Sequence, residues 1–112
     1  MPSFTLNTNL PRDKIPPNFP AEISKLLSKL TGKPESYITV AINSDQLRVF
    51  NGTPAPCASS TLEILGSVDS KKVTKEINGL IHEKLGIDFD RLFLFFYNLS
   101  GSQVGHGQST FG

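Results

Sequence analysis

Apolar residues recur at helical spacing in two parts of the chain, residues 19–30 and residues 73–85. Within each part they lie three or four positions apart, as they do on one face of an α-helix. Residues suited to helix ends flank both parts: Asn18 and either Asp69 or Ser70 as N-caps, and Gly32 and Gly86 as C-caps. The pattern predicts two amphipathic helices, each with one face turned toward a core.

Alternation of apolar and polar residues predicts four main strands, over residues 3–7, 37–42, 61–64 and 92–97. The last of these reads LFLFFY and is apolar on both sides, so we expect both of its faces to be covered. Short additional strands are expected over residues 47–50 and near residues 109–111.

The strand–helix–strand order occurs twice, and the two halves correspond at a nearly constant offset. Leu30 corresponds to Leu85, and Asn43 corresponds to Asn98. Right-handed crossovers would make the two strands within each βαβ unit parallel. We therefore predict an α+β fold in a single domain over residues 1–112, with a four-stranded mixed sheet, two helices on one face and short extra strands.

The predicted architecture leaves one face of the sheet open, because both helices cover the same side. Residues 92–97 would then expose large apolar side chains, which a monomer rarely tolerates over a wide patch. A closed symmetric assembly that buries this face or pairs the sheet edges would resolve the problem. The pattern alone leaves the number of subunits open.

Composition excludes several classes of partner. The net charge is +1, with 11 basic and 10 acidic residues and no basic stripe, so nucleic acid is not an expected partner. No apolar run reaches the roughly 20 residues that span a bilayer, so membrane insertion is not expected. The N-terminus lacks the pattern of a secretory signal, and the single cysteine, Cys57, is expected to be a reduced thiol in the cytoplasm.

Pro2 is the first candidate functional residue. It follows Met1, and because proline is small, removal of the initiator methionine is expected. The mature chain would then begin with a secondary amine, which only proline provides at a free N-terminus. The alternative is that Pro2 is simply a common second residue.

Four separated motifs together resemble the macrophage migration inhibitory factor family and, more distantly, D-dopachrome tautomerase. They are MPSFTLNTNLPRDKIPPNF, TGKPESYITV, NGTPAPCASSTLEILGSV and NLSGSQVGHGQSTFG, in order from Met1 to Gly112. The resemblance implies a homotrimer with a barrel-like interior and active sites between neighbouring subunits. It implies a cofactor-free intramolecular oxidoreductase, a keto–enol tautomerase of phenylpyruvate-like or dopachrome-like compounds. It also implies release without a signal peptide, as for the vertebrate cytokines of this family, so both cytoplasmic and secreted locations are expected.

The resemblance makes the Pro2 amine the general base. Tautomerisation needs a base that is neutral at working pH, and an apolar pocket and a nearby cation both favour the neutral amine. The resemblance places Lys33 beside that amine, where its charge would also hold a substrate carboxylate. The alternative for Lys33 is a lysine that faces the negative end of the preceding helix.

The resemblance assigns seven further residues to substrate binding: Tyr37, Leu65, Phe93, Phe95, Val104, His106 and Phe111. Each could equally be an ordinary core or interface residue. Phe93 stands where well-known members have a tyrosine, and Phe95 where they have an asparagine that reaches the neighbour's pocket. His106 stands in place of a tryptophan at the pocket rim. Because the two phenylalanines remove hydrogen-bonding groups, we expect a working but altered tautomerase.

Two other functions stay open. Arg12 and Asp45 match charged positions linked to chemokine-receptor engagement in the family, which suggests a cytokine-like ligand of a cell-surface receptor. The alternative is that Arg12 and Asp45 are ordinary charged residues in surface loops. A third interpretation is a trimer with weak or vestigial activity.

Thiol oxidoreductase activity is not expected, because Ser60 replaces the second cysteine of a Cys-x-x-Cys pair. No set of residues with the spacing of metal ligands is recognised in the sequence.

Overall fold

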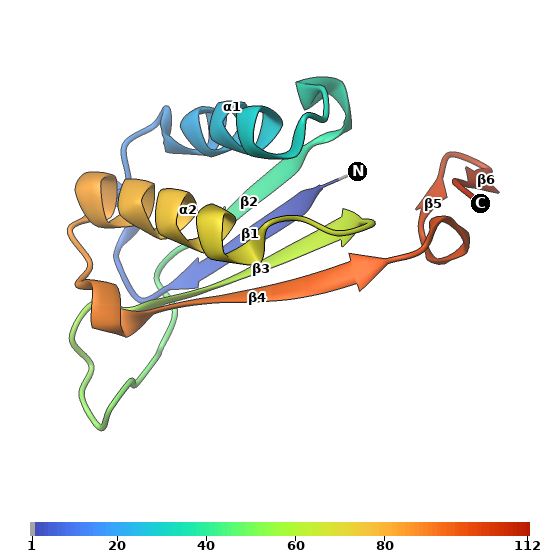
Figure 1. Cartoon of the computed structure of the whole chain (residues 1–112). Helices are drawn as coiled ribbons and strands as arrows, with labels where there is room; N and C mark the ends of the chain where they lie inside the picture. Colours follow the sequence, from blue (N-terminus) through green and yellow to red (C-terminus); the bar gives the residue numbers. More distant parts are fainter. Residues whose placement is uncertain (1) are drawn as a thin grey trace.

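The computed structural model describes residues 2–112 and contains one layer of strands beneath one layer of helices (Figure 1). The main elements are β1 (Ser3–Thr8), α1 (Phe19–Thr31), β2 (Thr39–Asn43), β3 (Ala58–Leu65), α2 (Ser70–Leu85), β4 (Leu92–Leu99), β5 (Gly105–His106) and β6 (Ser109–Thr110). Single 3-10 turns connect them: η1 (Arg12–Lys14), η2 (Glu35–Tyr37), η3 (Phe89–Arg91) and η4 (Gly101–Gln103).

The sheet confirms the predicted pair of βαβ units. Its strand order is β2-β1-β3-β4, with β1 parallel to β2, β3 parallel to β4, and β1 antiparallel to β3. Both helices lie on the same face of this mixed four-stranded sheet, as predicted (Figure 1). The two βαβ units therefore meet along the β1–β3 pair at the centre of the sheet.

Local sequence signals set the helix ends. Gly32 and Gly86 end α1 and α2 in the left-handed conformation, with φ of 73° and 70°. Asp69 caps α2, because its Oδ1 accepts a hydrogen bond from the amide of Lys72 at 3.1 Å. Asn18 occupies the N-cap of α1, but its side chain makes no capping hydrogen bond. The predicted ends are therefore correct, while only one predicted side-chain cap forms.

The core lies between the helices and the sheet. Phe4, Leu6 and Leu62 project from the central strands and are almost fully buried. The helices supply the other side of the core with Phe19, Ile23, Leu27, Val73, Ile77 and Ile81. These are the positions that the helical period selected, and burying each side chain contributes about 1.5–3 kcal/mol.

The opposite face of the sheet is open in the single chain. On this face β4 presents Phe93, Phe95 and Tyr97, which are 50%, 48% and 53% exposed. The prediction that residues 92–97 are covered on both faces therefore does not hold within one chain. The uncovered aromatic row is the one that the sequence identified as needing a partner.

Two predicted strand segments differ in the structure. Tyr37 lies in η2 rather than in β2, which starts at Thr39. Residues 47–50 form no regular strand, and only Phe50 makes an isolated bridge, to Thr53. Leu47 and Val49 are instead exposed, at 103% and 70%. A strand needs a neighbouring edge, and this segment has none within the described chain. The prediction near residues 109–111 is confirmed by the small β5–β6 hairpin, which projects beyond the end of β4 (Figure 1).

Candidate active site at one end of the sheet

The sheet topology places several candidate residues at one end. Pro2 immediately precedes β1, and β2 starts beside it because the Pro2 carbonyl accepts a hydrogen bond from the Thr39 amide at 3.1 Å. Since β3 runs antiparallel to β1, its last residue, Leu65, returns to the same end. β4 is parallel to β3 and delivers the C-terminal segment there as well. Chain segments far apart in sequence therefore converge around Pro2.

Pro2 itself is almost fully buried, with less than 2% of its surface exposed. It continues the alternation of Phe4 and Leu6, which face the helices. Pro2 therefore lies among the apolar residues between the sheet and the helices. The predicted removal of Met1 concerns a residue outside those that the structure describes.

Lys33 lies in the tight turn between α1 and η2, and its backbone is fixed from both sides. The Ser28 hydroxyl donates to the Lys33 carbonyl at 2.6 Å, and the Lys33 amide donates to Thr31 Oγ1 at 3.2 Å. The residue is half-buried and stands at the same end of the sheet as Pro2. The turn therefore fixes the backbone of Lys33 at this end of the sheet.

Three aromatic rings cluster at this end. The ring centroid of Tyr37 lies 5.9 Å from that of His106 and 6.2 Å from that of Phe111, both edge-on. His106 and Phe111 stack at 5.6 Å. The Phe111 amide donates to the carbonyl of Val104 at 3.2 Å, which draws the half-buried Val104 into the same group. These contacts form an aromatic wall at this end of the sheet.

Gly101 makes this arrangement possible, although sequence reasoning did not select it. The Phe111 amide also donates to the Gly101 carbonyl at 3.1 Å. A Cβ at Gly101 would lie 2.8 Å from the backbone carbonyl atoms of Phe111, closer than van der Waals contact permits. The glycine therefore allows the C-terminal segment to fold back beside η4. Its role depends on a backbone approach that leaves no local sequence signal.

Phe93 and Phe95 are not brought to this end within the chain. They occupy the first half of β4, where they pair with Ser59 and Thr61 rather than with the end of β3. Their rings stack at 5.9 Å, and Phe93 also packs against Phe50 at 5.4 Å. A role at the Pro2 site would therefore require a second copy of the chain.

Arg91 is a second residue that sequence reasoning missed. Its guanidinium donates to four backbone carbonyls at 2.8–3.1 Å, those of Phe50, Thr53, Ala55 and Pro56. It also lies 5.1 Å from the centre of the Phe50 ring. Because Phe50 packs against Phe93, Arg91 fixes both the loop over residues 50–56 and the start of the exposed aromatic row. A lone arginine before a strand gives no sequence sign of these distant partners.

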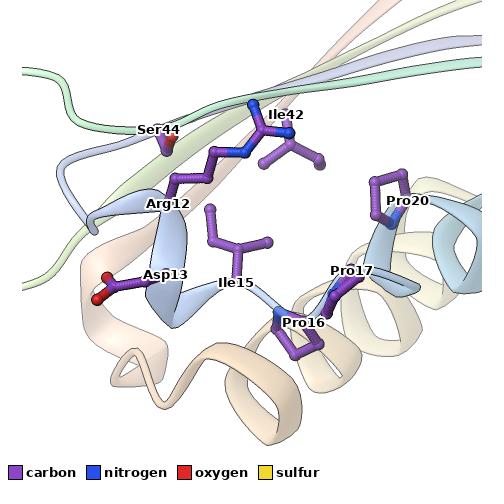
Figure 2. Close-up of a pocket in the computed structure, with 8 residues that line it drawn as sticks. All are labelled: Arg12, Asp13, Ile15, Pro16, Pro17, Pro20, Ile42 and Ser44. Carbon is purple, nitrogen blue, oxygen red and sulfur yellow. The ribbon is translucent and has the colours of Figure 1, made fainter.

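Arg12 and Asp45 lie together at the opposite end of the sheet. The Arg12 amide donates to Asp45 Oδ2 at 3.2 Å, and the Ser44 hydroxyl donates to the same oxygen at 2.8 Å. Beside them is an open cavity of about 440 Å³. Figure 2 shows the Arg12 side chain reaching across this cavity toward Ile42. The remaining lining is Asp13, Ile15, Pro16, Pro17, Pro20 and Ser44. The pair is therefore exposed, adjacent and remote from Pro2.

Three further observations concern the cysteine, metal binding and membrane spans. Cys57 is buried as a free thiol, and Thr8 Oγ1 donates to its carbonyl at 2.7 Å. Between residues 2 and 112 no three histidine, cysteine, aspartate or glutamate side chains group in a way that could hold a metal ion. Within the same range, no helix has the length and apolar character needed to cross a bilayer.

Comparisons with known proteins agree along the whole chain. A family model described as macrophage migration inhibitory factor matches residues 1–112. The macrophage migration inhibitory factor of Rattus norvegicus is 38% identical, over 99% of both chains. The homolog of Trichuris trichiura is 40% identical, covering 99% of this chain and 100% of its own. The solved structure of the Trichinella spiralis protein has a TM-score of 0.94 at 35% identity, covering 97% of this chain and 99% of its own.

Proposed function

Because the chain belongs to the macrophage migration inhibitory factor family, we propose that it is a keto–enol tautomerase whose general base is the amine of Pro2. Membership of this family supports a cytokine or tautomerase of its type, and therefore an isomerase, only in general terms. The observation that carries the specific proposal is the burial of Pro2 at the end of the sheet where β1 and β2 start and where β3 and β4 finish.

The proposed reaction moves one proton and leaves no net redox change. In the keto-to-enol direction, the neutral Pro2 nitrogen accepts a proton from the carbon beside the carbonyl. The electron pair of that C–H bond becomes the C=C bond, and the π pair of the C=O bond moves to oxygen. That oxygen takes a proton from water, and the protonated Pro2 nitrogen returns its proton to water. Reversal of these transfers ketonises the enol. The chain needs no cofactor for this chemistry, because it supplies the base from its N-terminal amine and the substrate-binding groups from its side chains.

Lys33 and the aromatic cluster supply substrate binding in this proposal. The Lys33 ammonium attracts the carboxylate of an aromatic α-keto acid such as phenylpyruvate. Tyr37, His106 and Phe111 offer ring faces and edges to the aromatic part, with Leu65 and Val104 as apolar walls. Small, flat and anionic compounds with an acidic C–H next to a carbonyl are the substrate class that this set fits.

We further propose that the active site is shared between the subunits of a homotrimer. Phe93 and Phe95 lie away from Pro2 in their own chain, and they are half exposed on an uncovered sheet face. Exposed Leu47 and Val49 add apolar surface that one chain leaves in water. Among residues 2–112, β2 is an edge strand paired with β1 alone, so it offers backbone groups to a neighbouring subunit. A closed ring of three copies buries these features together.

The direct test is conversion of hydroxyphenylpyruvate by the protein that begins with Pro2, beside a Pro2→Gly variant. Mass spectrometry establishes the N-terminus, and sedimentation establishes the assembly of both proteins. Turnover by wild type but not by the variant supports the proposal. Equal rates from two folded, equally assembled proteins would exclude Pro2 as the base.

Mixed assemblies test the shared site. Phe95→Ala is expected to weaken activity, and Pro2→Gly to abolish it. Refolding the two variants together creates sites that combine an intact Pro2 from one subunit with an intact Phe95 from its neighbour. Activity above that of either parent supports the shared site, whereas a strictly additive mixture contradicts it.

A receptor-ligand function is the second candidate, and the adjacency of Arg12 and Asp45 favours it. The two residues are exposed and hydrogen-bonded at the end of the sheet away from Pro2. Such a ligand would act outside the cell, in addition to a cytoplasmic pool. The double variant Arg12→Ala, Asp45→Ala should lose binding to a chemokine-type receptor and keep tautomerase activity. Loss of both functions in a folded protein would argue against separate sites.

A further inference from the structure

The dipeptide Asn–Gly occurs twice in the chain, and the structure places the two copies in opposite environments. Asn51 and Gly52 are exposed in the turn that begins the loop over residues 50–56. Asn78 and Gly79 lie inside α2, and both are half-buried. The two copies have the same local chemistry, so any difference in their reactivity comes from the fold.

An Asn–Gly pair reacts with itself because glycine has no side chain to hinder its backbone nitrogen. That nitrogen attacks the Cγ of the asparagine and forms a C–N bond, while the side-chain NH2 group leaves as ammonia with the proton of the attacking nitrogen. Water then opens the cyclic imide at either carbonyl. The products are aspartate and isoaspartate, in which the main chain runs through Cβ and Cγ. The net reaction consumes one water and releases one ammonia, without oxidation or reduction.

The surroundings of Asn51 and Gly52 leave this reaction open. Their φ angles are 54° and 72°, the left-handed conformations of an Asn–Gly turn. The Gly52 amide donates to no backbone carbonyl among residues 2–112, and nothing lies within 4 Å of the position that a Cβ on Gly52 would take. The loop that carries the turn extends past the sheet (Figure 1). Neither residue belongs to the apolar surface or the β2 edge that the proposed trimer covers.

Asn78 and Gly79 are held in a helix that opposes the same reaction. Gly79 lies in the interior of α2, where its amide is committed to the carbonyl four residues earlier. Asn78 Oδ1 is buried and has no hydrogen-bond partner among residues 2–112. Bringing the Gly79 nitrogen to the Asn78 Cγ requires rotation of the backbone between them, which would break the helix. Asn78 is therefore an internal control with the same local sequence.

The turn at Asn51 is closed, and Arg91 holds it closed. Across the turn, Phe50 and Thr53 exchange two backbone hydrogen bonds of 3.1 Å. Arg91 donates to the carbonyls of both residues, at 3.0 Å and 3.1 Å. The Asn51 backbone must rotate out of this turn before the Gly52 nitrogen can reach the Asn51 Cγ. The rate of the reaction therefore follows the fraction of molecules in which the turn is open.

We propose that Asn51 is a site of spontaneous deamidation and that Arg91 sets its rate by holding the turn closed. Isoaspartate adds one carbon to the main chain between Phe50 and Thr53, so the two hydrogen bonds across the turn no longer match. The ring of Phe50 packs against Phe93 at 5.4 Å, so deamidation loosens the loop beside the exposed aromatic row. The proposal does not depend on tautomerase activity, because the reacting groups lie outside the proposed active site.

The test incubates the full-length assembled protein in neutral buffer at physiological temperature. Peptide mapping by chromatography and mass spectrometry separates asparagine, aspartate and isoaspartate at each position. We expect first-order conversion at Asn51, with isoaspartate among the products, and no detectable conversion at Asn78 over the same period. No conversion at Asn51 in the folded protein, or equal rates at Asn51 and Asn78, would overturn the proposed site.

Arg91→Lys tests the control of the rate. This variant should convert Asn51 about tenfold faster, since fewer hydrogen bonds to the loop raise the open fraction, and should leave Asn78 unmodified. The control Lys75→Leu, on an exposed face of α2, should keep the wild-type rate at Asn51. A wild-type rate in Arg91→Lys would overturn the role of Arg91, and so would an equal rise at Asn78, which indicates global unfolding.

Hydrogen exchange tests the consequence for the loop. The amides of Phe50 and Thr53 should exchange faster in the purified isoaspartate form than in wild type. Asn51→Asp carries the same new charge without the extra backbone carbon, so its exchange should stay close to that of wild type. Equal exchange in the isoaspartate form and in Asn51→Asp would show that the longer main chain does not open the turn.

Discussion

The carbonyl oxygen of Pro2 accepts a hydrogen bond from the amide of Thr39 at 3.1 Å. This bond extends the parallel β1–β2 pairing by one step beyond Ser3 and anchors the residue that begins the proposed mature chain. A terminal amine is usually mobile, whereas the proposed amine of Pro2 would be attached to a paired and buried residue. A base can be effective only if its nitrogen is held where the substrate's C–H bond is presented.

The first prediction concerns the amine itself. A variant with one uncleavable residue before Pro2 converts the nitrogen into a tertiary amide, which has no basic lone pair. Hydroxyphenylpyruvate turnover should fall by about 10²–10⁴, the usual contribution of a positioned base. Stability in urea should change little, because Pro2 remains in the same buried position. Full activity in a protein whose mass proves the extension would rule out the amine.

The second prediction tests whether Lys33 binds the substrate through its positive charge or only maintains the shape of the turn. Lys33→Ala should raise KM for a phenylpyruvate-type acid about tenfold or more, because a charge-assisted contact to the carboxylate is lost. The methyl ester of the same compound lacks that negative charge, so its KM should be nearly unaffected. Steady-state kinetics with the acid and with the ester measure both KM values. An equal rise for acid and ester would instead indicate that Lys33 acts by shaping the turn after Gly32.

The third prediction concerns Arg91. Replacing Arg91 by leucine leaves four backbone carbonyls without their donor in a mostly buried site. We expect a loss of about 2–4 kcal/mol in the free energy of unfolding, measured in urea. Arg91→Lys should lose less, since an ammonium still donates to some of the carbonyls. Lys75→Leu, on an exposed face of α2, serves as the control and should change stability by under about 0.5 kcal/mol.

The helices and the strand pairing show which parts of the fold can be predicted from the sequence. The helices and their ends could be predicted because the period of apolar residues and the glycines at 32 and 86 are local signals. The parallel pairing followed from the repeated strand–helix–strand order and the handedness of crossovers. Residues 47–50 were wrongly predicted as a strand, because alternation does not reveal whether an edge is available for pairing.

The candidate site could be predicted only in part. The resemblance supplied Pro2, Lys33 and the aromatic residues, and the fold explains why most of them share one end of the sheet. Arg91 could not be found in this way, because its carbonyl partners lie 35 to 41 positions away in the chain. The importance of Gly101 was equally hidden, since it depends on the backbone of Phe111. Both are consequences of tertiary contact.

Gly101 gives the last prediction. Gly101→Ala would place a Cβ 2.8 Å from the carbonyl atoms of Phe111, so the C-terminal segment must move away from η4. Phe111 and the stacked His106 would then leave Tyr37, which should raise KM for aromatic substrates while the Pro2 chemistry is retained. The urea midpoint should fall only slightly, because this segment is largely exposed.

Gly79→Ala provides the matched control, because a Cβ there meets nothing within 4 Å and the residue lies inside α2. That substitution should raise the free energy of unfolding by about 0.5–1 kcal/mol, as alanine favours a helix interior over glycine. The KM of the Gly79→Ala protein for aromatic substrates should equal that of wild type. If Gly101→Ala also kept the wild-type KM, the aromatic cluster would have no part in substrate binding. Only a higher KM in Gly101→Ala alone ties the C-terminal segment to the proposed active site.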